Sequence, residues 1–299
     1  GGNDIISVGA LTALTIYISQ FWNPINTLAS FYNSLLTAIS YLERIFETID
    51  EPVNVKDAPG AVEMPPIKGE VEFSHVVFSY EPGVRILNDV NFKANVGDSF
   101  AIVGPTGAGK STIVNLISRF YNIDSGKILI DGIDINSVTI KSLRKQMGVM
   151  MQDSFIFSGT IMDNIRYGRL DATDEEVIAA AKAVHADQVV EKMDLGYQSD
   201  VGEGGDRLST GEKQLISFAR IVLKNPSIVI LDEATSSIDT ETEILIKEAL
   251  DIMLKDKTAF MVAHRLSTIR NADLILCMKD GDIVEQGTHE ELMEKGGFY

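Results

Sequence analysis

The residue types that most clearly indicate chemistry lie in one glycine-rich loop. Its sequence is Gly104-Pro105-Thr106-Gly107-Ala108-Gly109-Lys110-Ser111, which matches the pattern G-x-x-x-x-G-K-[ST] in full. The glycines let the backbone curl so that its N–H groups face phosphate oxygens. Lys110 would add a positive charge at the terminal phosphates, and the Ser111 hydroxyl would be a ligand of Mg²⁺. Together with the adjoining Thr112, this loop predicts a binding site for ATP and Mg²⁺.

A pair of carboxylates follows a second apolar run. Asp232 and Glu233 come directly after Ile228–Leu231. A carboxylate at the end of a buried strand can hold Mg²⁺, which is the role expected of Asp232. Glu233 can accept a proton from an attacking water, an effect typically worth about 10²–10⁴-fold in rate. Taken alone, the pair also fits two carboxylates placed at a helix N-terminus, where the helix dipole favours negative charge.

A third group of polar residues precedes an apolar helix. Leu208-Ser209-Thr210-Gly211-Glu212 lies just before the helix expected at 215–223. The Ser209 side chain can accept hydrogen bonds from the first N–H groups of that helix, and a capped helix end attracts anions. Taken alone, the segment is more typical of a simple helix cap.

Strands and helices must alternate to position these groups. The continuous apolar run 99–103 predicts a buried strand, and apolar residues at helical spacing over 110–120 predict a helix directly after the loop. Strand 227–231, helix 240–254 and strand 258–263 continue the alternation. The pattern is typical of an α/β fold, in which helices cover both faces of a parallel sheet. Further expected features are β-rich segments at 71–73, 76–78 and 86–96 and hairpin turns at Asp131-Gly132 and Asp280-Gly281.

The N-terminal part of the chain has a different character. No charged residue occurs among the 38 residues 5–42, whereas a membrane-spanning helix needs roughly 20. We therefore expect residues 1–49 to form a transmembrane helix with a cytoplasmic extension. Polar residues such as Gln20 and Asn23 interrupt the run, and the alternative is a long buried helix in a soluble bundle. Frequent proline and glycine predict a linker over 50–69, followed by one domain over 70–299.

Composition narrows the classes of function. The chain has 299 residues, of which 45% are hydrophobic and 23% charged, as in an ordinary globular protein. The net charge of −17 disfavours a nucleic-acid partner, because phosphate backbones require a basic surface. Cys277 is the single cysteine, so a disulfide within the chain is impossible, and it is expected to be buried on a strand. Because the sequence begins at Gly1 without a basic segment, we expect a fragment of a longer protein and no signal peptide.

Taken together, these motifs resemble the ATP-binding cassette transporters, in particular exporters that fuse membrane and ATPase domains. The resemblance covers residues 5–299, and the motifs come in the order that the family uses. The matching positions are Tyr80 against adenine, Gln152 in the glutamine loop, Leu208 to Gln214 as the signature, Asp232-Glu233 as the Walker B pair, Asp239 in the D-loop and His264 as the switch histidine. One departure is that the signature has Thr210 and Glu212 where the commonest form has Gly and Gln.

The resemblance implies a phosphate-loop ATPase fold, with a parallel core sheet and antiparallel and helical subdomains, preceded by one long transmembrane helix. It assigns Glu233 as general base, His264 to the γ-phosphate, and Gln152 to Mg²⁺ together with Ser111 and Asp232. Two cassettes would pack head to tail, so that ATP lies between the phosphate loop of one and the signature of the other. The partner would be an identical or a different half-transporter.

The resemblance also implies a place for the protein and leaves its cargo open. The full-length protein would sit in a membrane with its cassette in the cytoplasm, five further helices would precede this segment, and drugs, lipids and peptides all fit as exported substrates. Three alternatives are weighed against export. They are a soluble cassette ATPase of DNA repair or translation, an unrelated phosphate-loop kinase, and a regulatory half that binds ATP without hydrolysing it.

Overall fold

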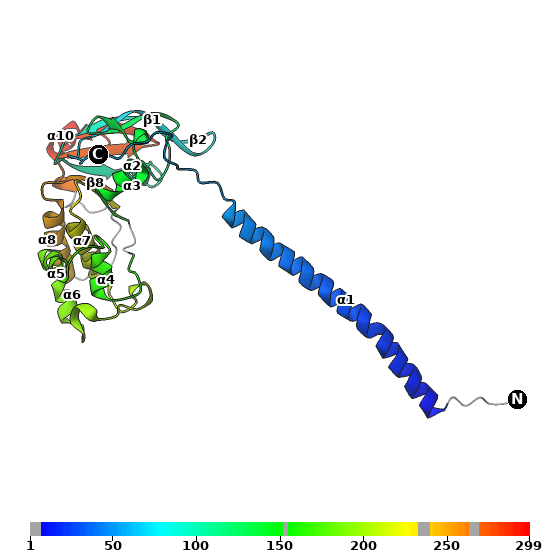
Figure 1. Cartoon of the computed structure of the whole chain (residues 1–299). Helices are drawn as coiled ribbons and strands as arrows, with labels where there is room; N and C mark the ends of the chain where they lie inside the picture. The colour runs from blue at the N-terminus through cyan, green and yellow to red at the C-terminus, as the bar shows by residue number, and fades with distance from the viewer. Residues whose placement is uncertain (1–6, 152–154, 233–239, 263–268) are drawn as a thin grey trace. The chain divides into compact units, whose positions relative to one another are not determined.

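The computed structural model describes residues 7–151, 155–232, 240–262 and 269–299, except for the side chains of residues 240 and 241 (Figure 1). The chain divides into two compact units, residues 1–54 and residues 55–299. The division falls inside the segment that the sequence predicts to be a linker.

The first unit consists of one long helix, α1 (Val8–Ile49). Ser7 caps its N-terminus by accepting a hydrogen bond from the backbone N–H of Ala10. The helix accommodates Pro24 in its interior, and none of its residues is buried. Among the residues that the structure describes, no helix has a stretch long and apolar enough to cross a bilayer. The expected long helix is therefore present, but its assignment as a transmembrane helix is not confirmed. A run without charged residues can still contain polar ones, and here residues such as Gln20 and Asn23 interrupt the apolar run.

The second unit contains two β-sheets. The antiparallel sheet has the strand order β2-β1-β4-β5, and the larger sheet has the order β10-β9-β3-β8-β7-β6. In the larger sheet β10 pairs antiparallel with β9, whereas the other neighbours are parallel. The strands are β1 (Val71–Glu81), β2 (Val84–Ala94), β3 (Ser99–Val103), β4 (Ser125–Ile130), β5 (Ile133–Asp134), β6 (Met147–Met150), β7 (Ile228–Asp232), β8 (Thr258–Val262), β9 (Leu274–Lys279) and β10 (Asp282–Gly287).

Two predicted hairpin turns are confirmed. Asp131-Gly132 joins β4 to β5, and Asp280-Gly281 joins β9 to β10. Both residues of each pair have positive φ, with values of 50° and 77° in the first turn and 49° and 88° in the second. Such angles are what a tight two-residue hairpin requires.

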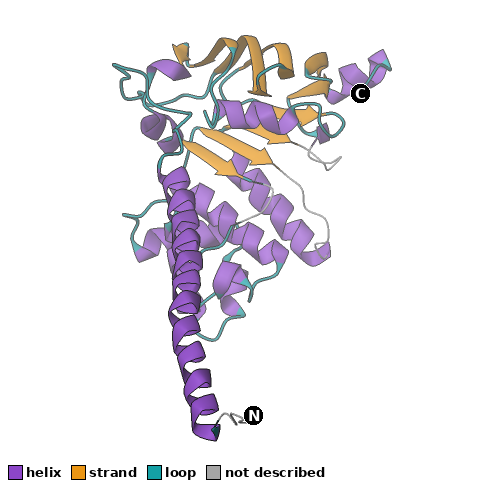
Figure 2. Cartoon of the chain, turned by 90° about the vertical axis from the view of Figure 1, so that its right-hand side faces the viewer, coloured by secondary structure: helices purple, strands orange, loops and turns teal. Residues whose placement is uncertain are grey.

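Helices α4 to α8 gather at the end of the second unit away from β1 and β2, as Figures 1 and 2 both show. The helices of this unit are α2 (Lys110–Ile117), α3 (Ile140–Lys145), α4 (Ile161–Arg166), α5 (Asp174–Ala183), α6 (Asp187–Glu191), α7 (Thr210–Lys224), α8 (Thr240–Leu254) and α10 (His289–Lys295), with 3-10 turns η1 (Ile135–Ser137), η2 (Gly196–Gln198) and η3 (Glu203–Gly205).

The larger sheet separates two hydrophobic cores. Phe100 and Ile102 of β3 belong to a core shared with the antiparallel sheet and α2, while Ala101 between them belongs to the core of the helical end. This division follows from the alternation of side chains along a strand. All three residues are at most 1% exposed, as expected for a strand covered on both faces.

Residues 55–69, here called the strap, are the first residues of the second unit and form hydrogen bonds with the rest of it. Val62 forms a parallel bridge with Val138, and the N–H of Met64 donates to the Ser142 hydroxyl at 2.8 Å. The Asp131 carboxylate accepts from the N–H groups of three successive residues, 68, 69 and 70. Most of the segment predicted to be a linker is therefore attached to the domain, because its backbone polar groups find hydrogen-bond partners there.

Candidate nucleotide-binding site

The glycine-rich loop joins the end of β3 to the start of α2, as the sequence predicts. Gly104 has φ of 149°, and a Cβ there would lie 2.2 Å from the backbone oxygen of Met278. Gly109 has φ of 97°, and a Cβ there would lie 2.8 Å from Leu87. Only glycine satisfies both the backbone angle and the space at these two positions. The loop can therefore run tightly against β9 and turn its amides toward the start of α2.

The Lys110 side chain curls over its own loop. Its Nζ donates to the carbonyl oxygens of Gly104 at 2.9 Å and Pro105 at 3.0 Å. Burial lowers the pKa of the Lys110 ammonium from its usual range, while the nearby negative charge of Asp232 acts in the opposite direction. The ammonium is thus held at the loop by two neutral carbonyl oxygens, which charged phosphate oxygens could replace.

Residues from five strands and helices meet at a pocket of about 460 Å³ beside this loop. The volume lies in the range of pockets for small molecules. Eight of the residues that line the pocket are predicted site residues, which are Tyr80, Thr106, Gly107, Gly109, Lys110, Ser111, Thr112 and Asp232. Ile86 of β2 and Val262 of β8 also line it, and the sequence carries no signal for these two beyond their place on strands.

Tyr80 stands at the edge of the pocket and is supported from two sides. Its hydroxyl lies 3.2 Å from the hydroxyl of Thr112, which is only 5% exposed. Its ring makes edge-type contacts with Phe78 at 4.8 Å and Tyr121 at 4.9 Å between centroids. Tyr121 was not predicted from the sequence, although its place just after the phosphate-loop helix could have indicated that it lies near the pocket. The three rings hold Tyr80, 46% exposed, as a surface for a planar group.

Asp232 ends β7 and is paired in register with Val262 of β8. With the Ser111 hydroxyl it offers oxygen donors on one pocket, and Mg²⁺ prefers such hard ligands. In the part of the chain that the structure describes, no cluster of three or more His, Cys, Asp or Glu could hold a metal alone. The donor set thus fits a magnesium ion that is held partly by phosphate oxygens and not by a protein cage.

The signature-like segment forms a complete helix cap. Ser209 Oγ accepts from the N–H of Glu212 at 3.3 Å, and the Glu212 carboxylate accepts from the N–H of Ser209 at 2.8 Å. This reciprocal pair begins α7 with a capping box. Leu208 and Gly211 are buried, while Ser209 and Thr210 are exposed. Among the described residues, the segment contributes nothing to the lining of the phosphate-loop pocket of its own chain.

Comparison with known proteins decides the family. The ABC transporter family model matches residues 87–236, half of the chain, including the phosphate loop, the signature-like segment and Asp232. The chain belongs to the ABC transporter family. The second unit is therefore the ATP-binding domain of an ABC transporter, and its mixed sheets are those of the ABC nucleotide-binding fold.

Relatives extend the similarity over almost the whole chain. An uncharacterized ABC transporter ATP-binding protein of Bacillus subtilis, YknV, is 50% identical over 99% of this chain and 49% of its own length. A fatty acid ABC transporter ATP-binding/permease protein of Mycobacterium tuberculosis is 48% identical over 98% of this chain and 46% of its length. The heavy metal tolerance protein of Schizosaccharomyces pombe is 47% identical over 98% of this chain and 35% of its length.

A solved structure supports the same assignment. A bacterial Atm1-family ABC exporter with ATP bound aligns with a TM-score of 0.80 and 41% identity, covering 98% of this chain and 51% of that one. This ABC transporter chain spans about half the length of the first curated relatives that it matches.

Four of the predicted site residues of this ABC transporter lie outside the described residues. They are Gln152, Glu233, Asp239 and His264. Their roles remain predictions from the family motifs. Glu233 directly follows Asp232 in the sequence, and Gln152 directly follows Met151 at the end of the described segment after β6.

An arginine that was not predicted from the sequence connects α7 to its neighbours. From α7, Arg220 donates to the carbonyl oxygens of Phe155 at 2.5 Å and Asn164 at 2.6 Å, and also to the Asn164 side chain at 2.5 Å. Its guanidinium lies over the ring of Phe157, 5.5 Å from the centroid. Burial lowers the pKa of Arg220 to about 10, which leaves it charged at neutral pH. Arg220 thereby fixes α7 to α4 and to the segment after Gln152.

Proposed function

We propose that this chain binds and hydrolyses ATP, and that the full-length protein uses this hydrolysis to export a substrate across a membrane. The observation that carries the proposal is the pocket beside the phosphate loop, where Lys110, Ser111 and Asp232 meet. A cation, a hydroxyl and a carboxylate at one helix N-terminus suit a nucleoside triphosphate with its magnesium ion.

The predicted site residues that line the pocket each have a proposed role in binding. Lys110 exchanges its loop carbonyls for the terminal phosphate oxygens, and Thr112 and the loop amides hold the remaining phosphates. Ser111 and Asp232 would hold Mg²⁺, which would neutralise phosphate charge when bound. Tyr80 offers its ring to adenine.

Hydrolysis requires the residues that follow the described strands. Glu233 comes after the end of β7 and takes a proton from the attacking water. His264 follows β8 by two positions and would contact the γ-phosphate, Gln152 would complete the Mg²⁺ site, and Asp239 lies in the D-loop motif. Because β6, β7 and β8 are neighbouring parallel strands, their carboxyl ends lie along one edge of the sheet, which supports a common site for these residues.

A second ABC subunit completes the site. Ser209 is exposed at the capped N-terminus of the 15-residue helix α7, where N–H groups and the helix dipole attract phosphate. Since this end belongs to no pocket with the phosphate loop among the described residues, we propose that it serves the ATP of a partner. The partner is an identical or a related half-transporter.

The export part of the proposal rests on α1 and on the relatives. Large apolar side chains such as Phe21, Leu28 and Phe31 are at least 65% exposed on α1 and need other helices against which to pack. The names of the relatives include permeases, and we propose that α1 belongs to the corresponding membrane part, with the ATP-binding domain in the cytoplasm. Those names differ in cargo, so the exported substrate stays unassigned.

The test uses the full-length protein reconstituted in lipid. Glu233→Gln should bind ATP as the wild type does but hydrolyse it at least tens of times more slowly, because the amide cannot act as a base. Glu248→Gln is the matched control, because Glu248 is exposed on α8 away from the motifs. Wild-type turnover in Glu233→Gln would reject that residue as the base, and a wild-type protein that neither binds nor hydrolyses ATP would overturn the function itself.

A further inference from the structure

A buried arginine stands just after the end of the phosphate-loop helix, away from the nucleotide pocket. Arg119 is 2% exposed and has φ of 52°, so the chain cannot continue as a helix there, and α2 ends at Ile117, three residues before the predicted end at 120. Its Nε is buried and has no hydrogen-bond partner in the described part of the chain. A charged side chain is rarely buried unless its other donors are engaged.

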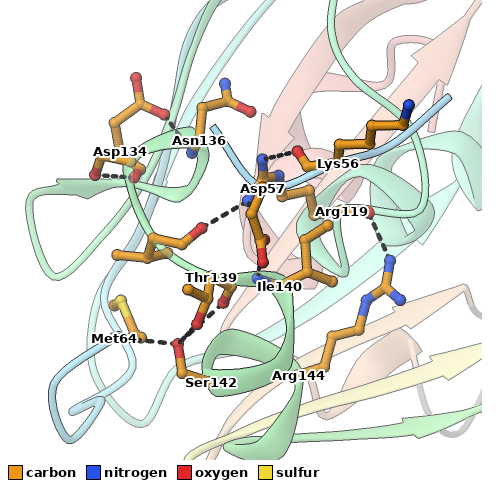
Figure 3. A network of polar contacts seen from close by, with 12 residues as sticks. Lys56, Asp57, Met64, Arg119, Asp134, Asn136, Thr139, Ile140, Ser142 and Arg144 are labelled. Atoms are coloured by element: carbon orange, nitrogen blue, oxygen red, sulfur yellow. Dashed lines mark hydrogen bonds and ion pairs between the residues drawn. The ribbon is translucent and has the colours of Figure 1, made fainter. Parts of the chain in front are cut away.

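Those donors reach two segments that are distant in sequence. One terminal nitrogen, Nη1, donates to the carbonyl oxygen of Val138 at 2.7 Å, and Nη2 donates to that of Lys56 at 3.1 Å (Figure 3). Nη1 also lies 4.0 Å from the carboxylate of Asp57. Lys56 and Asp57 are the second and third residues of the strap. The guanidinium therefore joins the end of the phosphate-loop helix to the start of the strap.

Asp57 is held by a second contact that fixes its position. Its Oδ1 accepts from the N–H of Ile140 at 2.7 Å, the first residue of α3 (Figure 3). The adjacent Thr139 hydroxyl binds Ser142 instead of capping the helix. A carboxylate from the strap thus supplies the cap of α3, and its negative charge suits the positive end of that helix.

Helix α3 also contacts the residues that directly follow α2. From α3, Arg144 donates to the carbonyl oxygens of Ser118 at 2.9 Å and Arg119 at 2.7 Å, and it lies over the Phe120 ring. Burial, followed by the positive charge of Arg119, lowers the pKa of Arg144. The end of α2, the start of α3 and the start of the strap are therefore joined through two arginines and one aspartate.

The phosphate loop lies one short helix away. α2 has eight residues, so it extends about 12 Å at ~1.5 Å per residue. Lys110, Ser111 and Thr112 at one end line the nucleotide pocket, while Ile113 and Leu116 along the helix are fully buried. A short, tightly packed helix moves as a body, because its buried side chains leave no space for independent adjustment. A displacement of α2 on phosphate binding would therefore also displace Arg119.

We propose that Arg119 and Asp57 form a latch through which nucleotide binding at the phosphate loop and seating of the strap favour each other. Arg119 is a positioning residue in this arrangement, since it touches neither nucleotide nor metal. The inference rests on the proposed binding of ATP. It adds a route by which the strap, at the start of the ATP-binding domain, senses the nucleotide, and only six residues, 50–55, separate α1 from Lys56. Such coupling is reciprocal by thermodynamic necessity.

The test is hydrogen–deuterium exchange and nucleotide affinity measured on the full-length protein. In the wild type, ADP with Mg²⁺ should slow exchange in peptides that cover the strap and residues 136–146. Asp57→Ala should bind ADP about fivefold more weakly, at the lower end of coupling between sites, and should abolish the nucleotide effect on strap exchange. Arg119→Gln should behave alike, and Arg119→Lys, which keeps the charge, should be milder.

Arg169→Gln is the matched control, since Arg169 makes a surface ion pair with Glu176 on the helical end. A merely structural latch would speed strap exchange equally with and without nucleotide and would leave the Kd for ADP unchanged in Asp57→Ala, and that result would overturn the proposal. Because Asp57 is 46% exposed, its variant should fold even if Arg119→Gln does not. Failure of the wild type to bind ADP or ATP at all would instead overturn the proposed function, and the latch with it.

Discussion

The hydroxyl of Tyr80 lies 3.2 Å from the hydroxyl of Thr112, so strand β1 and helix α2 are joined across the nucleotide pocket. The contact places the Tyr80 ring and the Thr112 hydroxyl side by side in the lining of one pocket, where a single small molecule could meet both. It means that the ring is held in place before a nucleotide arrives, which reduces the ordering cost of binding.

We expect Tyr80→Ala to raise the KM for ATP about tenfold with little change in kcat, because stacking of a base on an aromatic ring is worth about 1–3 kcal/mol. Tyr80→Phe keeps the ring and loses only the hydroxyl contact with Thr112, so its KM should rise less than about threefold. Steady-state ATPase assays on the full-length protein measure both. Equal defects in the two variants would show that the hydroxyl, and not the ring, is what ATP requires.

Gly104→Ala should abolish ATP binding and destabilise the domain by about 2 kcal/mol or more. The new Cβ would meet a backbone oxygen of β9 at 2.2 Å, and backbone cannot move aside as a flexible side chain can. Gly132→Ala is the control, since it has φ of 77° but open space around it, and it should cost about 1 kcal/mol. Urea unfolding followed by circular dichroism gives both values, and similar losses in the two variants would refute the role of the close contact.

The capping box predicts how the unusual signature behaves. Glu212→Ala should cost about 0.5–2 kcal/mol by leaving the Ser209 N–H without its partner. Glu212→Gln restores the commoner family residue and can still accept that hydrogen bond, so it should change the free energy of unfolding by less than about 0.5 kcal/mol. The same measurement in both variants checks this, and a Gln variant as unstable as the Ala variant would mean that the carboxylate charge is essential.

Cys277 should not react with alkylating reagents in the folded protein. Burial raises the pKa of its thiol to about 11, and Glu285 adds to the shift, so the reactive thiolate is scarce at pH 8. The side chain is fully buried on β9. Since Cys277 is the single cysteine, its labelling by iodoacetamide should begin only as the domain unfolds in urea. Rapid labelling of native protein at pH 8 would contradict this expectation.

Local chemistry explains which features the sequence predicts. The phosphate loop is visible because Gly104, Gly109 and Lys110 each have one function that one residue type performs. The hairpin at Asp131-Gly132 is equally visible, because both positions need positive φ.

Other features depend on contacts between residues far apart in the sequence, and such contacts leave no periodic pattern. The strap is rich in proline and glycine, and its attachment depends on side chains such as Asp131 and Ser142 far along the chain. Arg119 likewise ends α2 through its own backbone angle and its long-range partners, although apolar spacing continues to Phe120. Over 5–42, the absence of charge predicts a membrane span, which the described residues do not confirm.

The alternation of Phe100, Ala101 and Ile102 on β3 has a consequence for how the domain loses its structure. In the described part of the chain the two cores lie on opposite faces of one sheet, so we expect two cooperative regions, each opening at its own free energy. Phe218 and Leu215 of α7 contribute to one region, and Phe100 and Ile113 to the other. Partial denaturation can therefore melt the helical end while the phosphate loop keeps its shape, so ATP would protect one region from denaturant far more than the other.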